Sequence, residues 1–552
     1  MISLGLDTLL LGIAPAQEMK LFPPLRDIDS AYAQQALRYA DDALSMDIRL
    51  PLFSEGREAR RQVRREVTKA VALGLCLRER AEYATCLADA LWAICMEDDW
   101  HAISGEGAID TAAAQTGALI ATCCSLHKGA LDAISPDIIK RCRAEIRRRV
   151  LRPVAQYTRL NWLSDDGVEP ACCALLECAV LQGEEGGERW LVVKKALRLL
   201  EAYLNTKKEA HFFSIRDFME RAGALCDTFS LLKLISGGKI DLTRDNALQR
   251  DVLLPLAAYI GNGWFVDPGA GNMRFEPDTR MLFHIGLGMQ QKRLTGMAAY
   301  FALASRPMQS TLYQRRCFLA ESGEYAREPV ALSLFPEICM EKQGYMAMRS
   351  ETLFCAVHAG SGFHADAGDI ALFYRGEPVL IDIGEVSRAE WHNVPVVCGI
   401  QQIPGVLASD LDFRGERGYT ALSLSLTRAY DARARLSSWQ RTLMLMGSAV
   451  RLIDMFELGS AGRVDFRFIT PIAPKRTDNG IQLGAIFLSW EGMPLTCRID
   501  SIEPQSDTFG DRVYRITLSM QEDVRGGSVA FTFEDMGRET QDDAVYRDTV
   551  LQ

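Results

Sequence analysis

The sequence predicts a multidomain α + β protein, in which a helical N-terminal half is followed by an antiparallel β C-terminal half. From about Ala31 to Arg306, apolar residues recur at spacings of three and four, the period of an amphipathic helix. Beyond Ser333, short runs with alternating apolar and polar residues end in turns rich in Gly and Pro, the pattern of antiparallel strands. At 552 residues, the chain is also too long for one ordinary core.

Helical periodicity is strongest in nine segments of the N-terminal half, which clusters of Gly, Pro and Asp separate. These segments are 57–77, 81–96, 110–126, 136–157, 170–181, 188–204, 218–235, 246–260 and 278–288. Because the connections between them are short, we expect helical hairpins stacked in an arc or a closed ring. This repetition is structural, and a solenoid without enzymatic activity would show it equally.

The C-terminal half should fold as a sandwich of large antiparallel sheets. About a dozen short strands are expected there. One β-hairpin is well defined, with a strand over 370–374, a turn at Arg375-Gly376-Glu377 and a return strand over 379–383. The polar residues after Gly537 predict a loose tail.

Polar side chains stand at the ends of this hairpin. His364 and Asp366 precede its first strand, Asp382 closes the second, and His392-Asn393 follows a short loop. The whole chain has only seven histidines. Imidazole and carboxylate groups at the ends of adjacent strands can converge on one metal ion. The alternative is that both histidines cap turns and bond to the backbone, and residue types alone do not decide between the two.

Composition and charge exclude some classes of protein. A net charge of −10 with interspersed signs argues against nucleic acid or an anionic membrane as the partner. The 15 cysteines are scattered, with adjacent pairs at Cys123-Cys124 and Cys172-Cys173, which indicates buried free thiols in a reducing compartment. We therefore expect a cytoplasmic protein without a membrane span, although a short apolar run near the N-terminus leaves secretion open. Homo-oligomerisation also stays open.

The strongest basic run, over 141–152, has two interpretations. The first is a solvated face of a helix, which is the commoner reason for such a run. The second is a basic wall that would contact an acidic saccharide. We favour the first interpretation.

Motifs in both halves resemble those of the heparinase II/III-like polysaccharide lyases. In the C-terminal half, the order His-Ala-Asp-Ala-Gly, Gly-Glu-Pro-Val-Leu-Ile-Asp-Ile-Gly and His-Asn-Val-Pro, with Gly399 and Gln402 after it, resembles the family's β-sandwich signature. In the N-terminal half, Trp100-His101, Asn161-Trp162 and the segment 220–242 resemble the family's Trp loop, Asn-Asn-Trp motif and Gly-Gly turn. The resemblance implies an (α/α) toroid over residues 1–320 and a β-sandwich over residues 321–552.

The same resemblance implies a lyase that cleaves an acidic, uronate-containing oligosaccharide or polysaccharide by β-elimination. This reaction needs neutralisation of the C5 carboxylate, a base for the α-proton and an acid for the leaving O4. The candidate catalytic residues are Asn161, His364 and, as a nearby substitute, His211. Substrate contacts are expected from Trp162, Trp100, Arg216 and Gln402. The positions that match the family's zinc ligands are His364, Asp382 and His392.

Three positions depart from the family's pattern among the residues that carry the chemistry. Leu160 stands where one of two paired asparagines is expected, Phe218 where a tyrosine is expected, and Gly362 where a first histidine is expected. Phenylalanine has no proton to donate, so the family mechanism does not carry over intact; His358 is a further candidate for the missing group. Two hypotheses follow: an acidic-glycan lyase with an altered acid/base pair, or an inactive relative that binds saccharide or serves as a structural partner.

Overall fold

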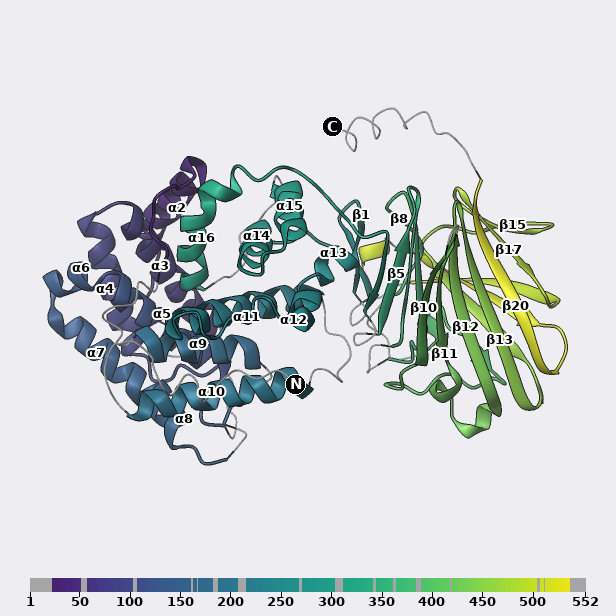
Figure 1. Ribbon diagram of the computed structural model, residues 1–552, viewed down its shortest axis with the longest axis horizontal. Helices are drawn as coiled ribbons and strands as arrows, with labels where there is room; N and C mark the ends of the chain where they lie inside the picture. The colour runs from purple at the N-terminus through teal and green to yellow at the C-terminus, as the bar shows by residue number, and fades with distance from the viewer. Residues whose placement is uncertain are drawn as a thin grey trace. The chain divides into compact units, whose positions relative to one another are not determined.

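The computed structural model of the protein describes residues 22–50, 57–102, 107–159, 162–165, 167–181, 187–206, 215–267, 271–302, 311–340, 344–360, 364–383, 389–416, 419–503, 507–510 and 512–536. The chain divides into two compact units (Figure 1). The helical unit comprises Met1–Lys208, Arg216–Leu253 and Pro277–Ser333. The strand unit comprises Glu209–Ile215, Leu254–Glu276 and Leu334–Gln552. The predicted order of helices followed by antiparallel strands is confirmed.

The helices follow one another with short connections. They are α2 (Ser30–Ala43), α3 (Arg57–Leu77), α4 (Ala81–Cys95), α5 (Thr111–Leu126), α6 (Lys128–Ile134), α7 (Pro136–Ile146), a π-helical turn (Arg147–Leu151), α8 (Arg152–Gln156), α9 (Val168–Leu181), α10 (Gly187–Thr206), α11 (Ile215–Ile235), α12 (Asn246–Asp251), α13 (Leu254–Ala258), α14 (Thr279–Gly288), α15 (Lys292–Phe301) and α16 (Leu312–Tyr325). None of these helices combines the length and apolar composition needed to cross a bilayer.

Local sequence explains where α5 begins and why α5 and α9 are buried. The side chain of Asp110 accepts a hydrogen bond from the backbone N–H of Ala113 at 2.8 Å and so caps the first turn of α5. Both helices consist mainly of small and apolar residues, and most residues of each are buried. The adjacent pairs Cys123-Cys124 and Cys172-Cys173 lie in these helices as buried free thiols, as predicted.

Two predictions for the N-terminal half are corrected by the structure. The helix predicted over 246–260 ends earlier, and a three-stranded sheet follows with β1 (Tyr259–Gly261), β2 (Trp264–Asp267) and β3 (Gly271–Arg274). Asn262 and Gly263 have φ values of 50° and 79°, which form a tight turn that no helix continues through. At the other end, helical structure extends beyond the predicted limit of 306, because α16 runs to Tyr325.

The strand unit contains three larger antiparallel sheets. The strands are β4 (Glu337–Met340), β5 (Tyr345–Arg349), β6 (Leu353–His358), β7 (Ile370–Tyr374), β8 (Glu377–Leu380), β9 (Val396–Val397), β10 (Ser409–Glu416), β11 (Tyr419–Ser425), β12 (Leu436–Met446), β13 (Ala449–Gly462), β14 (Val464–Thr470), β15 (Lys475–Thr477), β16 (Gly480–Leu483), β17 (Ile486–Glu491), β18 (Leu495–Ile502), β19 (Val513–Met520) and β20 (Val524–Asp535). Their orders are β4-β5-β6-β7-β8, β18-β19-β14-β9 and β10-β11-β12-β13-β20-β17-β16-β15.

One apolar core joins the three sheets. It includes Leu372 of the five-stranded sheet, Phe466 of the four-stranded sheet and Leu452 of the eight-stranded sheet, all at most 1% exposed. The long strands β12, β13 and β20 lie side by side in Figure 1. Only short 3-10 turns interrupt the strands in the described part of the C-terminal half, as predicted.

The predicted hairpin forms, but its second strand is shorter than expected. Arg375 and Gly376 turn the chain at φ values of 51° and 77°. β8 ends at Leu380 rather than at residue 383, because the next backbone N–H groups bond elsewhere. That of Ile381 donates to the carbonyl of Ile469, and that of Asp382 donates to a side chain of β3. The single strand predicted over 480–490 is likewise divided, into β16 and β17.

Three arginines of the basic run over 141–152 pair with one carboxylate inside the run, and Arg147 pairs with Glu188 of α10. Arg141, Arg148 and Arg149 each contact the carboxylate of Glu145. The side chains of Arg141 and Arg148 are 42% and 60% exposed, whereas that of Arg149 is 11% exposed. These contacts agree with the favoured interpretation of a solvated helix face.

Candidate functional site

Four buried ionisable side chains meet at one end of the hairpin in the strand unit. His358 is the last residue of β6 and Asp369 directly precedes β7, and their backbones pair, with the His358 N–H donating to the Asp369 carbonyl at 3.2 Å. Asp382 follows β8, and His392 follows a 3-10 turn at Ala389–Trp391. None of the four is more than 5% exposed. We call His358, Asp369, Asp382 and His392 the His–Asp cluster.

Within the His–Asp cluster, histidines and carboxylates alternate. His392 Nδ1 lies 3.0 Å from Asp369 Oδ2 and 3.1 Å from Asp382 Oδ1. His358 Nε2 lies 3.6 Å from Asp382 Oδ2, which is beyond ordinary hydrogen-bond distance. Burial strengthens these electrostatic interactions, because little water is present to screen them.

The charges set one another's protonation. Burial opposes the charged form of His392, but Asp382 and Asp369 outweigh it and raise the pKa of His392 well above its ordinary value. Burial likewise opposes ionisation of Asp382, but His392 and His358 hold the pKa of this carboxyl far below its usual range. For Asp369, burial and the neighbouring Asp382 raise the pKa. The cluster therefore holds a charged His392 against an ionised Asp382.

A buried hydrogen-bond network fixes the cluster in place. The amide of Asn393 donates to Asp369 Oδ1 and to the carbonyls of Ile370 and Ile381, each within 2.9 Å. Arg441 donates to the carbonyls of Gly368 and Asn393, both at 2.8 Å. These bonds tie the start of β7 to the loop that carries His392.

The donor set of the His–Asp cluster fits a metal ion. One ligand atom each of His358, Asp369 and Asp382 lies within 4.8 Å of the others. Among the described residues, neither ring nitrogen of the buried His358 has a hydrogen-bond partner. A buried imidazole without partners is costly, and an ion that takes imidazole and carboxylate ligands would satisfy it. This set overlaps the predicted set only in Asp382.

The other predicted residues of the strand unit lie beside the cluster. The rings of His364 and His392 face each other at an interplanar angle of 28°, with centroids 5.8 Å apart. Asp382 and His392 are therefore brought together as predicted, and His364 adjoins them. Gln402 is 4% exposed, and its side-chain amide accepts from the N–H of Ala367 and donates to the carbonyl of Ala367, both at 2.9 Å. Gln402 thus holds the loop before β7, and its contact with substrate stays a prediction.

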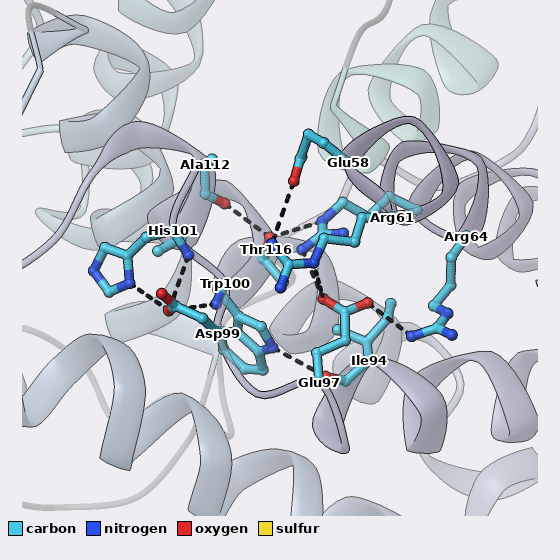
Figure 2. Close-up of polar contacts among 12 residues, drawn as sticks. Glu58, Arg61, Arg64, Ile94, Glu97, Asp99, Trp100, His101, Ala112 and Thr116 are labelled. Carbon is cyan, nitrogen blue, oxygen red and sulfur yellow. Dashed lines mark hydrogen bonds and ion pairs between the residues drawn. The ribbon is translucent and has the colours of Figure 1, made fainter. Parts of the chain in front are cut away.

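In the helical unit, the predicted Trp100 lies next to a buried ion cluster (Figure 2). Its indole N–H donates to the carbonyl of Ile94 at 3.0 Å, and the side chain is buried. The neighbouring Glu97 pairs with Arg64 at 2.8 Å and with Arg65 at 3.2 Å. Trp100 is thus engaged in the fold of its own loop, and its predicted contact with substrate is untested.

The remaining predicted residues are only partly described. Trp162 is 4% exposed, and its carbonyl accepts from the N–H groups of Ala108 and Ile109 at 2.8 and 3.2 Å. Arg216 and Phe218 lie in the first turn of α11, where Phe218 is buried. Asn161, His211, Leu160 and Gly362 lie outside the described residues.

Sequence reasoning did not include two members of the site. The sequence prediction does not name Asp369, and it names His358 only as a candidate for the missing proton donor. The two meet because the register of β6 with β7 places Val357 opposite Ile370, and so His358 beside Asp369. The approach of Asn272 in β3 to Asp382 had no signal, since 110 residues separate them.

Comparisons with solved structures relate the fold to polysaccharide lyases. A heparinase III structure aligns with a TM-score of 0.63 and 11% identity, covering 95% of this chain and 88% of its own. The heparan sulfate lyase HepC from Pedobacter heparinus gives 0.62 and 11%, with coverage of 97% and 87%. The chondroitin AC lyase of Streptomyces coelicolor A3, in complex with chondroitin sulphate, gives 0.54 and 12%, with coverage of 99% and 84%.

These likenesses lie at identities where they establish the fold alone. No family model matches the sequence, and no curated protein is similar to it in sequence. The chain therefore has a polysaccharide-lyase fold, in agreement with the resemblance in its motifs.

Proposed function

We propose that the protein is a polysaccharide lyase that cleaves an acidic, uronate-containing glycan by β-elimination. The observation that carries this proposal is the likeness to heparinase III and to a heparan sulfate lyase over 95% and 97% of the chain. A third structure of the same fold contains chondroitin sulphate. The proposal includes an (α/α) toroid over residues 1–320, a β-sandwich over 321–552 and a cytoplasmic location.

The roles of individual residues follow from the chemistry of elimination. Asn161 would donate its amide to the C5 carboxylate, so that the adjacent proton becomes acidic. His364, beside the His–Asp cluster, would exchange a proton with the sugar, with His211 as the second candidate. Phe218 cannot serve as the acid, because its side chain has no proton to donate. His364 and His211 are therefore proposed in place of the family's tyrosine.

Zinc is the proposed cofactor, and the His–Asp cluster would hold it. The ligands would come from His358, Asp369 and Asp382, or from the predicted set of His364, Asp382 and His392. When bound, zinc supplies a fixed positive charge that can stabilise a developing anion. The residues themselves orient the start of β7 and position the ring of His364 next to that of His392.

The proposal is tested by incubating the purified protein with a panel of uronate-containing glycans and following the ultraviolet absorbance of the unsaturated product. Asn161→Ala should lower turnover by about 10²–10³-fold, as expected for the loss of one stabilising donor. Phe218→Tyr should raise activity if a missing proton donor limits the rate. No absorbance change with any glycan in the panel, under zinc-replete conditions, would contradict the proposal.

The second candidate is a non-catalytic relative that binds saccharide. The observation that favours it is Phe218, a side chain without a proton at the position where the family's tyrosine is expected. Binding of an intact acidic oligosaccharide without any unsaturated product would support this candidate over the lyase.

A further inference from the structure

The four-stranded sheet of the strand unit carries arginine and threonine side chains on the face away from the apolar core. Arg467 of β14 lies opposite Thr517 of β19, and Thr517 lies opposite Arg498 of β18. Arg515, two residues before Thr517 on β19, shares this face, because side chains alternate between the two faces along a strand. The alternate residues of β14 and β19 belong to the core: Phe466, Phe468, Ile516 and Leu518. We call Arg467, Arg515 and Thr517 the Arg–Thr cluster.

Four polar atoms of the Arg–Thr cluster are buried and have no hydrogen-bond partner among the described residues. They are Nε and Nη1 of Arg467, Nε of Arg515 and Oγ1 of Thr517. The whole side chain of Thr517 is enclosed, since the residue is only 4% exposed. Native interiors rarely leave such groups unpaired. Because three of the four atoms are N–H donors, their concentration on two adjacent strands indicates an occupant that accepts hydrogen bonds.

The carboxylate nearest to Arg515 is already shared. Asp500 Oδ2 lies 3.1 Å from Nε of Arg498 and 3.4 Å from Nη2 of Arg515. The second contact of Arg515 is a long hydrogen bond from Nη1 to the carbonyl of Glu390, at 3.4 Å. Neither contact uses Nε of Arg515, so this edge of the guanidinium group is left for a ligand.

Arg467 is the least compensated charge of the cluster. It forms no ion pair with any described residue, although Asp465 and Glu390 are close enough to favour its charged form. Burial and the neighbouring Arg515 lower the pKa of Arg467, and the two carboxylates offset this effect only in part. An anion between Arg467 and Arg515 would accept their free N–H groups and relieve the repulsion between them. The unpaired donors, rather than the net charge of the face, thus indicate the ligand.

We propose that the Arg–Thr cluster binds a tetrahedral oxyanion, phosphate or sulfate. Such an ion can direct one oxygen toward each of the three side chains, and the fork of N–H groups in arginine matches phosphate geometry. The donors are buried, which favours a compact ion, and the 18% exposure of the Arg515 side chain gives it access from solvent. The cluster shares no residue with the His–Asp cluster, and the inference does not depend on the proposed function.

Binding is measured by isothermal titration calorimetry on the full chain, with inorganic phosphate and inorganic sulfate as probes at constant ionic strength. Arg467→Met should lower the affinity for phosphate by about tenfold or more, because it removes charge-assisted hydrogen bonds. The control is Arg414→Met on β10, whose guanidinium group is exposed and pairs with Asp412 at 2.6 Å. No heat with either ion would overturn the proposal, and an equal loss in the control would show an adventitious ion only.

Thr517→Val tests the site with a smaller change, because it replaces an unpaired hydroxyl with a methyl group of the same shape. Phosphate affinity should fall about threefold to tenfold, while the melting temperature of the ligand-free protein stays equal or rises. An unchanged affinity would overturn the assignment of Thr517 to the site.

Thermal unfolding separates a binding role of Arg467 from a structural one. Phosphate should raise the melting temperature of the wild type above that in chloride of the same ionic strength, because a ligand that binds the folded state stabilises it. Arg467→Met should lose this rise without a lower melting temperature in chloride, since it removes a poorly compensated charge. A rise as large as that of the wild type would overturn the proposal.

Methyl phosphate distinguishes the two sources of such an oxyanion. Affinity equal to that of inorganic phosphate, and equally reduced in Arg467→Met, would support a site for an esterified group. Binding of inorganic phosphate alone would support a site for the free ion.

Discussion

The two units each contain a buried histidine among carboxylates, and the two histidines differ in how their ring nitrogens are used. In the helical unit, His284 Nε2 lies 2.8 Å from Asp227 Oδ1, and Nδ1 lies 3.0 Å from a carboxylate oxygen of Glu321. The other oxygen of Asp227 accepts from Gln314 at 2.7 Å. In the strand unit, neither ring nitrogen of His358 has a hydrogen-bond partner among the described residues, and the nearest carboxylate oxygen, Asp382 Oδ2, lies 3.6 Å from Nε2. The first arrangement is complete without a ligand, and the second is not.

This difference separates a structural network from a binding site, although both are buried and charged. Burial alone lowers the pKa of a histidine, and the carboxylates of Glu321 and Asp227 reverse that effect for His284 and raise its pKa well above the ordinary value. A charged His284 between two carboxylates stabilises the fold, and both of its ring nitrogens are already bonded. Burial opposes the charged form of His358, but the nearby carboxylates, Asp382 first among them, raise its pKa from a longer distance of 3.6 Å.

The largest expected effect is the loss of stability when the complete network is broken. Asp227→Ala removes the partner of Nε2 on the charged ring of His284 and the acceptor of the Gln314 side-chain N–H. The free energy of unfolding of the helical unit should fall by about 3–5 kcal/mol. Urea unfolding, followed by circular dichroism, measures this change.

A surface variant of the same type provides the control for Asp227. Asp89→Ala, on the exposed side of α4, should change the free energy of unfolding by less than about 0.5 kcal/mol. A loss below about 1 kcal/mol in Asp227→Ala would contradict the structural role of the network.

The next effect concerns metal affinity and distinguishes the two ligand sets. If the His–Asp cluster holds zinc, His358→Ala and Asp382→Ala should each lower zinc affinity by roughly 100-fold or more, because even supporting residues contribute about 10–100-fold. The zinc affinity of each variant is measured as the zinc content that remains after equilibration with a series of chelators. His101→Ala, in the helical unit, is the control. Loss in His364→Ala but not in His358→Ala would favour the set predicted from the sequence. Equal zinc content in all variants would exclude a zinc site here.

The smallest effect is a dependence of stability on pH. The pKa of His284 is raised in the folded protein, so its contribution is fully present below the unfolded value of about 6.5 and is lost as pH rises toward the folded pKa. Stability attributable to His284 should therefore fall by about 1.4 kcal/mol per pH unit above pH 6.5. Melting temperatures of wild type and His284→Gln between pH 6 and 9 test this. Parallel profiles would show that His284 does not titrate as inferred.

The sequence was most informative where a local period determines the element. Helical spacing predicts α3 and α14 closely, and short apolar runs predict β6 and β7, which are buried on both faces. It was least informative at 246–274, where the turn at Asn262-Gly263 and the apolar Trp264-Phe265-Val266 give a small sheet inside a helical region. The helical pattern around it concealed three strands of only three or four residues each.

For the candidate site, the sequence indicated the hairpin but not the whole cluster. His392 and Asp382 were expected to meet because both follow the same hairpin, and they lie 3.1 Å apart. The approach of His358 to Asp382 depends on the pairing of β6 with β7, which hydrophobic pattern alone does not define at single-residue precision. The Arg–Thr cluster could not be predicted either, because it depends on the pairing of β14 with β19, which are not consecutive in the chain.

The small sheet β1–β3 has a consequence for how the protein can be made and divided. It belongs to the strand unit, although it precedes α14, α15 and α16 of the helical unit in the chain. Asn272 of β3 accepts the N–H of Asp382 at 2.8 Å, and its own N–H donates back to the carbonyl of Asp382 at 3.0 Å. During synthesis, Asn272 leaves the ribosome 110 residues before Asp382. The two hydrogen bonds between these residues can therefore form only late. A fragment that begins at Leu334 would lack this brace, and its His–Asp cluster would be assembled without one of its supports.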